Sequence, residues 1–308
     1  MDKNSKILIT GSGGMVGSAV RRLLNDAGYY NLLTPRKAEL NLCDTAAVIA
    51  YFEQHQPEYV FLIAAKVGGI HANMTYRADF IFENLMMQSN VINTCKDFNI
   101  KKLLFVSSGC IYPKLAENPI PESSMLTGLL EPSNEHYSVA KIAGIKMCEA
   151  YHLQYGLDYA VVIPNNIYGP GDNYHPENSH VMAALIRKFD EAIKHNTDVE
   201  IWGSGNQMRE FVYVDDVASA CISLMDSDYI GMYNCSSEFE LTIKELAALI
   251  GEILGFTGEI YYNTNKPEGH MRKGFTCKKL RDTGWSAQTD IQTGIQLAYN
   301  WYKENIDR

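Results

Sequence analysis

Two short segments of this sequence carry the side chains that could do chemistry. The first holds Ser108 and Cys110, and the second holds Tyr137 and Lys141. A four-residue spacing places the phenol and the amine on one helix face. A two-residue spacing at a strand end lets the hydroxyl and the thiol point the same way. A phenol, a lysine and a serine can protonate a ketone oxygen while a hydride arrives at its carbon. The thiol adds a second chemistry, the removal of a proton from the carbon beside that ketone.

Each of these residues also has an ordinary structural interpretation. A half-buried tyrosine and an extended lysine are common on helices, and a lone cysteine is most often a small buried hydrophobic residue. In a catalytic group, Lys141 would stabilise the phenolate of Tyr137 and lower its pKa, and Ser108 would bind the same oxygen. His180 is either a helix-start residue without chemistry or the acid partner of Cys110. Their separation along the chain leaves both possibilities open.

A glycine-rich loop near the amino terminus predicts a dinucleotide site. Gly11, Gly14 and Gly17 follow a short apolar strand and open a helix. In that context the first glycine permits a tight turn, the second lets backbone amides approach a pyrophosphate, and the third allows close packing of helix and strand. Met15 and Val16, in the same turn, are included in the predicted cofactor site. The alternative is a flexible glycine turn.

The end of the second strand bears on the choice between NAD and NADP. An NAD site usually has an acidic residue about 20 residues after the loop, but this region holds Arg36 and Lys37. Two cations here favour the 2′-phosphate of NADP, although solvated loop charges are common. Ala64, Ala65 and Lys66 end the third strand, where small residues would let the backbone flank the cofactor. Simple close packing of strand and helix is the alternative there.

The elements that must position these residues alternate through the first half of the chain. The pattern predicts strands at 7–10, 32–34, 59–64, 102–107 and 159–163, and helices at 16–25, 45–55, 79–98 and 137–155. A threonine cap is expected at the start of the second helix. Repeated strand–helix units with apolar strands are typical of an α/β fold with a doubly wound parallel sheet, the Rossmann arrangement.

The second half is less regular and predicts a smaller α/β lobe interwoven with the first. We expect a loop over a site at 169–179, helices at 180–195 and 242–254, and strands at 200–202 and 210–214. Thr242 and Glu245 have the spacing of a capping box. We assign residues 1–168, with part of 211–235 returning, to an NADP-binding domain, and 169–210 with 236–308 to a substrate-binding lobe.

Composition narrows the class of function. The 308 residues are 46% hydrophobic and 20% charged, which is ordinary for a globular chain. The net charge of −9 argues against a nucleic-acid-binding surface. Seven scattered cysteines without a CxxC pair predict reduced thiols and no metal site. Because no apolar stretch approaches the roughly 18 residues of a membrane span, and the first apolar run is too short for a signal peptide, we expect a cytoplasmic protein without membrane partners.

Together these residues resemble the extended short-chain dehydrogenase/reductases, and more specific strings are similar to those of the GDP-L-fucose synthases. The strings lie at 65–70, 110–114, 140–146, 168–173, 178–181, 202–205 and 208–211. The resemblance runs nearly end to end. It implies a two-stage reaction, in which GDP-4-keto-6-deoxy-D-mannose is epimerised at C3 and C5 and NADPH then reduces C4.

The resemblance also implies a role for each site residue. Cys110 would be the base and His180 the acid of the epimerisation. Ser108, Tyr137 and Lys141 would serve the enolate and the reduction. The remaining expected contacts are Pro164, Asn166, His180, Tyr137 and Lys141 toward the cofactor, and Asn166, Lys188, Trp202, Arg209 and Arg272 toward the GDP-sugar.

Three positions depart from the family pattern. Gly109 stands where Ser or Thr is usual, which could loosen the turn between Ser108 and Cys110. Gly13 replaces an arginine that some members carry near the adenosine phosphate, so the preference for NADP depends on other cations. Lys188 replaces an arginine, and an ammonium cannot make the bidentate contact of a guanidinium.

Several alternatives stay open from the sequence. The substrate could be another GDP-keto sugar such as a heptose, the enzyme could be a 4-epimerase that keeps its cofactor, or the chain could be a non-catalytic dinucleotide sensor. Family members commonly pair through two helices, so a homodimer is expected. The apolar residues available for such a contact are Phe80, Leu85, Met86, Ile145, Met147 and Cys148. Their alternative is ordinary core packing.

Overall fold

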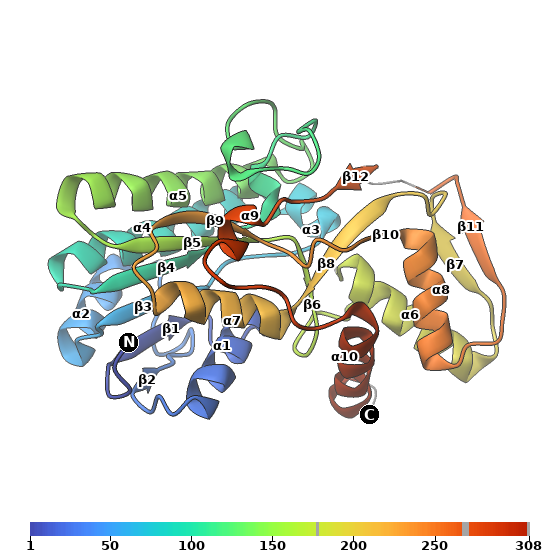
Figure 1. Cartoon of the computed structure of the whole chain (residues 1–308), viewed down its shortest axis with the longest axis horizontal. Coiled ribbons are helices and arrows are strands. Elements are labelled where there is room, and N and C mark those ends of the chain that lie inside the picture. The colour runs from blue at the N-terminus through green and yellow to red at the C-terminus, as the bar shows by residue number, and fades with distance from the viewer. Residues whose placement is uncertain (177–178, 267–270, 307–308) are drawn as a thin grey trace.

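The computed structural model describes residues 1–176, 179–266 and 271–306, so residues 177 and 178 of the expected loop lie outside the description. Within these residues, a central parallel sheet has the strand order β2-β1-β3-β4-β5-β9. Its strands are β1 (Ile7–Thr10), β2 (Leu32–Leu33), β3 (Tyr59–Leu62), β4 (Lys102–Val106), β5 (Tyr159–Pro164) and β9 (Gly231–Cys235). Figure 1 shows helices on both faces of this sheet. The predicted doubly wound fold is confirmed.

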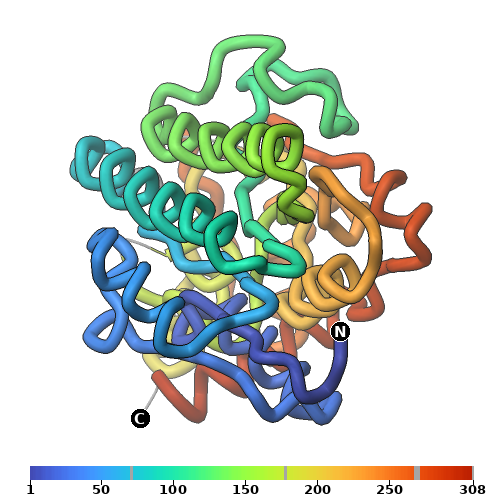
Figure 2. The backbone as a smooth tube through the Cα atoms, turned by 90° about the vertical axis from the view of Figure 1, so that its left-hand side faces the viewer, coloured from blue at the N-terminus to red at the C-terminus, as the bar shows by residue number. Residues whose placement is uncertain are grey.

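Two groups of helices cover the central sheet. One face carries α1 (Met15–Asp26) and α7 (Val214–Met225), and the other carries α2 (Thr45–His55), α4 (Arg77–Asp97) and α5 (Glu135–Tyr155). The end-on view in Figure 2 shows α4 and α5 side by side. The short α3 (Ile70–Thr75) precedes α4, and the 3₁₀ turns η1 (Gly109–Ile111) and η2 (Glu122–Ser124) follow β4.

The strands are apolar because both of their faces are buried. On β1, Ile7 and Ile9 enter the core beneath α1 and α7, while Leu8 enters the core beneath α2, α4 and α5. The first core continues without a break into the second half of the chain, where it includes Phe189 and Leu246. The smaller lobe therefore shares its interior with the sheet.

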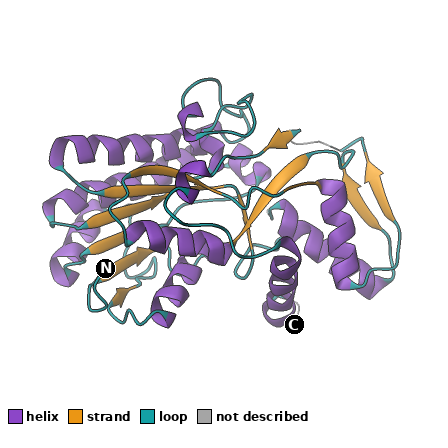
Figure 3. Cartoon of the chain, viewed as in Figure 1, coloured by secondary structure: helices purple, strands orange, loops and turns teal. Residues whose placement is uncertain are grey.

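The smaller lobe lies at one end of the central sheet (Figures 1 and 3). Its strands pair as β10-β8-β12 with β6 also on β8, and as β11 on β7. The strands are β6 (Asn166–Tyr168), β7 (Val199–Trp202), β8 (Met208–Tyr213), β10 (Glu240–Thr242), β11 (Ile260–Asn263) and β12 (Arg272–Lys273). The helices are α6 (Val181–His195), α8 (Ile243–Leu254), α9 (Lys278–Arg281) and α10 (Ile291–Asn305). The boundaries that we assigned between domain and lobe stay a prediction.

The sequence predicted the bounds of α2 correctly but not its capping residue, and it missed several elements. The cap of α2 is Asp44, whose side chain accepts from the backbone N–H of Ala47, and not the expected threonine. The capping box of α8 is present as predicted. Helix α7 was missed because its first residue, Val214, follows the strand without a capping side chain, so the apolar run reads as one strand. The other unpredicted elements are α3, α9, α10, β6, β9, β10, β11, β12, η1 and η2.

One buried carboxylate connects the sheet to the lobe. Glu210 on β8 is 2% exposed, and its Oε2 accepts hydrogen bonds from Asn165 Nδ2 at 2.8 Å, Ser236 Oγ at 2.6 Å and the Phe275 backbone N–H at 3.0 Å. These donors follow β5, β9 and β12. Burial raises the pKa of Glu210, and the three donors oppose that rise. The carboxylate thus joins three chain segments that are distant in sequence.

Candidate active site

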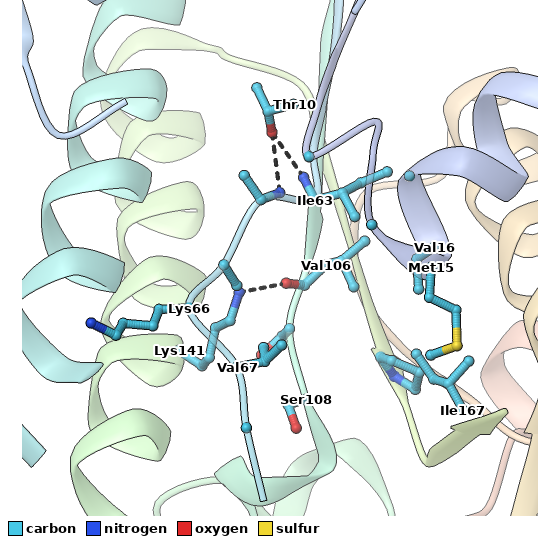
Figure 4. Close-up of a pocket in the computed structure, with 18 of the residues that line it drawn as sticks. Thr10, Met15, Val16, Ile63, Lys66, Val67, Val106, Ser108, Lys141 and Ile167 are labelled. Carbon is cyan, nitrogen blue, oxygen red and sulfur yellow. Dashed lines mark hydrogen bonds between the residues drawn. The ribbon is translucent and has the colours of Figure 1, made fainter. Parts of the chain in front are cut away.

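The described residues line a cavity of about 1400 Å³ at the carboxyl ends of the central strands. This edge is where doubly wound sheets bind their ligands. The lining includes the glycine loop at one end and the predicted reactive group at the other, and Figure 4 shows part of both. The reactive residues along its wall are Ser108, Cys110, Tyr137, Lys141 and His180.

At the nucleotide end, the glycine loop is held against β1 and β3. Gly11 has a φ of +72°, and a Cβ there would lie 2.8 Å from the Ala64 backbone. A Cβ on Gly17 would lie 2.1 Å from the carbonyl oxygen of Gly11, so the helix cannot approach the loop with any other residue. Thr10 Oγ1 accepts from the backbone N–H groups of Ile63 and Ala64, which fixes the two strand ends (Figure 4).

This loop fits a dinucleotide phosphate. Gly14 is the N-cap of α1 and provides no capping side chain, so the first-turn amides have no side-chain acceptor and can serve an anion. Met15 and Val16 line the cavity beside them, and so do Ala64 and Ala65. The backbone therefore forms a cradle that a larger residue would fill.

The three cations predicted near the cofactor have different environments. Arg36 and Lys37 are exposed and line the cavity edge. Lys66 instead pairs with Glu83 and, at 3.5 Å, with Asp79, and Figure 4 shows its side chain directed away from the glycine loop. The hydrogen bond to Glu83 raises the pKa of Lys66. The Lys66 backbone N–H donates to Asn84 Oδ1 and its carbonyl accepts from Asn84 Nδ2, each at 3.0 Å. Lys66 therefore shapes the cavity wall, while Arg36 and Lys37 offer positive charge.

At the reactive end, Ser108 and Cys110 are related by a turn and not by strand alternation. Strand β4 ends at Val106, and Ser108 caps the 3₁₀ turn η1 by accepting from the Cys110 backbone N–H at 3.4 Å. The expectation that strand geometry aligns the two side chains is therefore wrong. Asn134, which the sequence did not single out, donates from Nδ2 to Cys110 Sγ at 3.1 Å.

Tyr137 and Lys141 lie in the first turns of α5 and are 8% and 2% exposed. Lys141 Nζ donates to the Val106 carbonyl at 2.9 Å (Figure 4) and lies 4.6 Å from the centre of the Phe105 ring. Burial lowers the pKa of Lys141 to about 7.

The phenol of Tyr137 behaves differently from our expectation. Burial raises its pKa, the neighbouring Cys110 raises it further, and a hydrogen bond with Ser108 opposes the rise. The expected lowering by Lys141 is wrong for this arrangement, because the ammonium is directed at a backbone carbonyl and its own charge is disfavoured by burial. The phenol is therefore a proton donor that stays protonated at neutral pH.

The fold brings His180 to the same cavity as Cys110. The sequence alone left open whether these two residues meet. His180 is the N-cap of α6, and its side chain makes no capping hydrogen bond. The protein around the imidazole lowers its pKa by desolvation. An imidazole and a thiol thus line the same cavity, where they can exchange protons with a bound molecule.

Two of the predicted substrate contacts line this cavity. Asn166 Nδ2 donates to the Glu210 carbonyl at 2.7 Å, and Arg209 Nη1 donates to the Met208 carbonyl at 2.7 Å. Burial lowers the pKa of Arg209. Pro164 lines it as well, together with Lys273, one of the cations that we expect to supply positive charge for a GDP-sugar. These residues supply positive charge and amide groups beside the reactive end.

The other three predicted contacts lie outside the residues that line the cavity. Arg272 is bound by Glu240 through Nε at 2.9 Å and Nη2 at 2.6 Å. Trp202 is 53% exposed, and the ammonium groups of Lys188 and Lys266 lie 5.4 Å and 5.3 Å from its ring centre. We call Lys188, Trp202 and Lys266 the cationic cluster. It has the aromatic face and the charge that a nucleotide needs.

No group of three or more histidine, cysteine or acidic side chains could hold a metal ion in the part of the chain that the structure describes. No helix in that part is long and apolar enough to cross a membrane.

Comparison with known proteins agrees with the fold and the glycine loop. The NAD dependent epimerase/dehydratase family matches residues 7–235. The chain therefore belongs to this family.

Relatives narrow the class further. GDP-L-fucose synthase 1 of Arabidopsis thaliana is 49% identical over 99% of this chain and 95% of its own length, and the GDP-L-fucose synthase of Escherichia coli is 46% identical over 98% of both chains. A solved structure of a GDP-mannoheptose C4 reductase from Campylobacter jejuni with NADP bound is 36% identical, with a TM-score of 0.90 over 98% of this chain and 99% of that one. Within the family, the chain thus groups with the GDP-L-fucose synthases.

Proposed function

We propose that the protein converts GDP-4-keto-6-deoxy-D-mannose into GDP-L-fucose with NADPH. The observation that carries the proposal is the meeting of Cys110 and His180 with Ser108, Tyr137 and Lys141 on one cavity. A reductase alone needs only the last three. The proton-transfer pair is the addition that epimerisation requires, and the GDP-L-fucose synthases similar to this chain support the choice of substrate.

The residues at the nucleotide end fit NADP(H). Gly11, Gly14 and Gly17 form the phosphate cradle, and Arg36 and Lys37 supply cations for a 2′-phosphate. The related heptose reductase is described with NADP bound. When bound, NADPH supplies the hydride that reduces C4 of the sugar.

In the epimerisation, we assign Cys110 as the base and His180 as the acid. The C4 ketone acidifies the C–H bonds at C3 and C5, so the Cys110 thiolate can remove a proton and leave an enolate. The protonated imidazolium form of His180 then delivers its proton to the opposite face of the carbon and is left neutral. Hydrogen bonds from Ser108 and Tyr137 would stabilise the negative charge that develops on the ketone oxygen.

In the reduction, Tyr137 gives its proton to the oxygen at C4. Its raised pKa keeps the phenol protonated until that oxygen becomes strongly basic. Lys141, with its pKa near 7, can carry a positive charge beside the developing phenolate or stay neutral when the site is at rest. The same two side chains also border the nicotinamide end of the proposed cofactor site.

For the GDP-sugar, we assign Asn166 and Arg209 to the sugar-diphosphate and the cationic cluster to the base. Lys188 donates to the Glu200 carbonyl at 3.0 Å and lies over the ring of Trp202, so its ammonium stays close to the stacking face. Arg272 would reach a diphosphate only by exchanging its contact with Glu240 for it. Lys273 is the neighbouring cation that already lines the cavity.

We also propose a homodimer through α4 and α5. Three of the residues that we named for this contact, Phe80, Ile145 and Cys148, are buried within the chain, so they belong to its core. The exposed apolar side chains on these two helices are Phe82 at 61%, Val139 at 42%, Leu153 at 78% and Tyr155 at 51% exposed. A cytoplasmic location and the absence of nucleic-acid and membrane partners stay predictions, supported for location by seven free cysteines.

The deciding experiment supplies GDP-4-keto-6-deoxy-D-mannose and NADPH in deuterated water and identifies the product sugar by NMR. We expect a fucose-configured product with deuterium at C3 and C5 and one NADPH consumed for each sugar. Cys110→Ser should lose the deuterium exchange while it still binds NADPH. A rhamnose- or talose-configured product would contradict the epimerase assignment. Much faster turnover of a GDP-4-keto-heptose would show that the heptose, and not the 6-deoxyhexose, is the substrate.

A further inference from the structure

The side-chain amide of Asn134 is directed at the sulfur of Cys110. Its Nδ2 lies 3.1 Å from Sγ, at a partly buried position on the wall of the cavity. Hydrogen bonds to ionised acceptors are shorter and stronger than those to neutral ones, and sulfur is a large atom. A contact of this length therefore suits a thiolate acceptor.

The position of Asn134 makes this contact informative. Asn134 is the N-cap of α5, where an asparagine side chain usually accepts from the backbone two or three residues on. The side chains of Asp44, Thr242 and Asp290 do so at the starts of α2, α8 and α10. Asn134 makes no such capping bond. Its side chain is directed at the cysteine and not at the first-turn amides.

A fully buried serine lies beside the Asn134 side chain. Ser138 Oγ donates to the Asn134 carbonyl at 3.0 Å and lies 3.5 Å from the side-chain oxygen Oδ1. With Oδ1 on the side of this hydroxyl, the NH₂ group faces the sulfur. Helix α5 thus presents a donor to η1 and not an acceptor.

We propose that Asn134 is a positioning residue for Cys110, whose amide holds the sulfur in place and favours the thiolate over the thiol. This inference rests on the proposed function, because it concerns the base of the epimerisation. The amide is neutral, so it stabilises the anion without offering a proton that the thiolate could take. The donated hydrogen bond also limits rotation about the Cα–Cβ bond of Cys110.

Other groups that share this wall cannot replace the amide. Lys141 donates to the Val106 carbonyl, and Tyr137 is a neutral phenol that is hydrogen-bonded with Ser108. The remaining titratable groups that line the cavity near the reactive end are His180, Arg209 and Lys273. Among these described neighbours, Asn134 is the side chain that donates a hydrogen bond to the sulfur.

The test measures the sulfur directly and needs no turnover. Wild type, Asn134→Ala and Asn134→Asp are alkylated with iodoacetamide over a range of pH, and the modified Cys110 peptide is quantified by mass spectrometry. We expect the alkylation profile to move to higher pH by about one unit in the alanine variant, with roughly tenfold slower reaction at neutral pH. The aspartate variant, which places an acceptor where the donor was, should move further.

Two controls separate positioning from folding. Asn93→Asp makes the same chemical change on α4, where Asn93 accepts from Tyr151, and should leave the profile in place. Because Asn134 makes no capping bond, thermal unfolding of the alanine variant should stay close to that of the wild type. If the aspartate variant does not fold, the alkylation profile of the alanine variant is sufficient to test the positioning role.

The two proposals fail in different ways. An alkylation profile of Asn134→Ala that superposes on that of the wild type would overturn the positioning role, even if the wild-type enzyme makes GDP-L-fucose. A shifted profile in a protein that leaves the keto-sugar unchanged would support the contact and reject the proposed function. When both hold, solvent-deuterium exchange into the substrate should fall about tenfold in Asn134→Ala, with NADPH binding unchanged.

Discussion

At the reactive end of the cavity, Tyr137 and Lys141 are 8% and 2% exposed, whereas Trp202 in the cationic cluster is 53% exposed. The buried pair is held by a helix and by a strand carbonyl, through Lys141 and Val106. In the cluster, the half-buried Lys188 and the exposed Lys266 lie over one indole ring.

The difference separates two kinds of contribution. Buried groups have shifted pKa values because desolvation acts on them, so they control proton transfer and their replacement should change rates or stability. Exposed cations are screened by water and salt, so they should contribute to binding and little to the chemical step. Four substitutions test this division, and they follow from the largest expected effect to the smallest.

The largest effect should come from Tyr137→Phe. Removing the proton donor should lower kcat for NADPH oxidation by roughly 10²–10⁴-fold, the usual contribution of a general acid. The KM for the keto-sugar should change little, because the aromatic ring remains. Steady-state kinetics provides the measurement, with Tyr155→Phe, an exposed position on the same helix, as the matched control. Retention of wild-type kcat would remove Tyr137 from the chemistry.

The next effect should come from Gly109→Ala. A Cβ on Gly109 would lie 2.5 Å from Cζ of Phe275, which is 1% exposed. The glycine therefore does not loosen the turn, as the sequence suggested, but lets a ring pack against it. Overpacking here should cost about 3 kcal/mol of unfolding free energy in urea. Phe275→Leu in the same chain should recover part of the loss, and additive effects of the two changes would reject the contact.

A substitution of Asp172 tests whether burial also shifts a pKa, and with it the stability, outside the reactive end. Burial raises its pKa to about 6, and the Asn173 backbone N–H opposes the rise. The folded carboxyl binds its proton more tightly than the unfolded one. Its contribution to stability is therefore complete below about pH 4 and lost as the pH rises to about 6.

Asp172→Asn should therefore be more stable than the wild type above about pH 6, by about 2 kcal/mol, and equally stable near pH 4. Urea unfolding at several pH values measures the difference between the two proteins. Asp228→Asn, at an exposed position, should track the wild type throughout. A constant difference at all pH values would mean that Asp172 does not titrate in this range.

The smallest effect should come from Trp202→Ala. Loss of a stacking face for the base should raise KM for the GDP-sugar about tenfold, with kcat within about twofold of wild type. Tyr229→Ala, an exposed aromatic just before β9, serves as the control. A fall in kcat that equals the rise in KM would place the cationic cluster in the chemical step and break the division between the two regions.

The parts that the sequence predicted well depend on local spacing. The glycine loop and the Tyr137–Lys141 pair follow from residues within one turn or one strand–helix unit, and the structure places both on the cavity. The position of His180 beside the same cavity depends on the path of the whole chain. In the sequence, Asn134 has only the features of a helix cap. Its contact with Cys110 depends on the 3₁₀ turn η1, which the sequence did not predict.

Recognition of the substrate was harder to predict for the same reason. Arg272 and Lys273 are adjacent in sequence and look equivalent as cations. The structure binds the first to Glu240 and leaves the second on the cavity wall. Strand alternation decides between them once β12 is paired with β8, and that pairing joins segments too distant for a local pattern to show.

The Glu210 carboxylate has a consequence for how ligands enter. Its Oε2 accepts from Asn165, Ser236 and Phe275, so any swing of the smaller lobe away from the sheet would strip donors from a buried charge. Each lost bond would cost roughly 1.5–3 kcal/mol. Sheet and lobe should therefore tumble as one rigid body, without a hinge at this junction. Entry of the substrate and release of the product would then depend on exposed loops at the rim of the cavity.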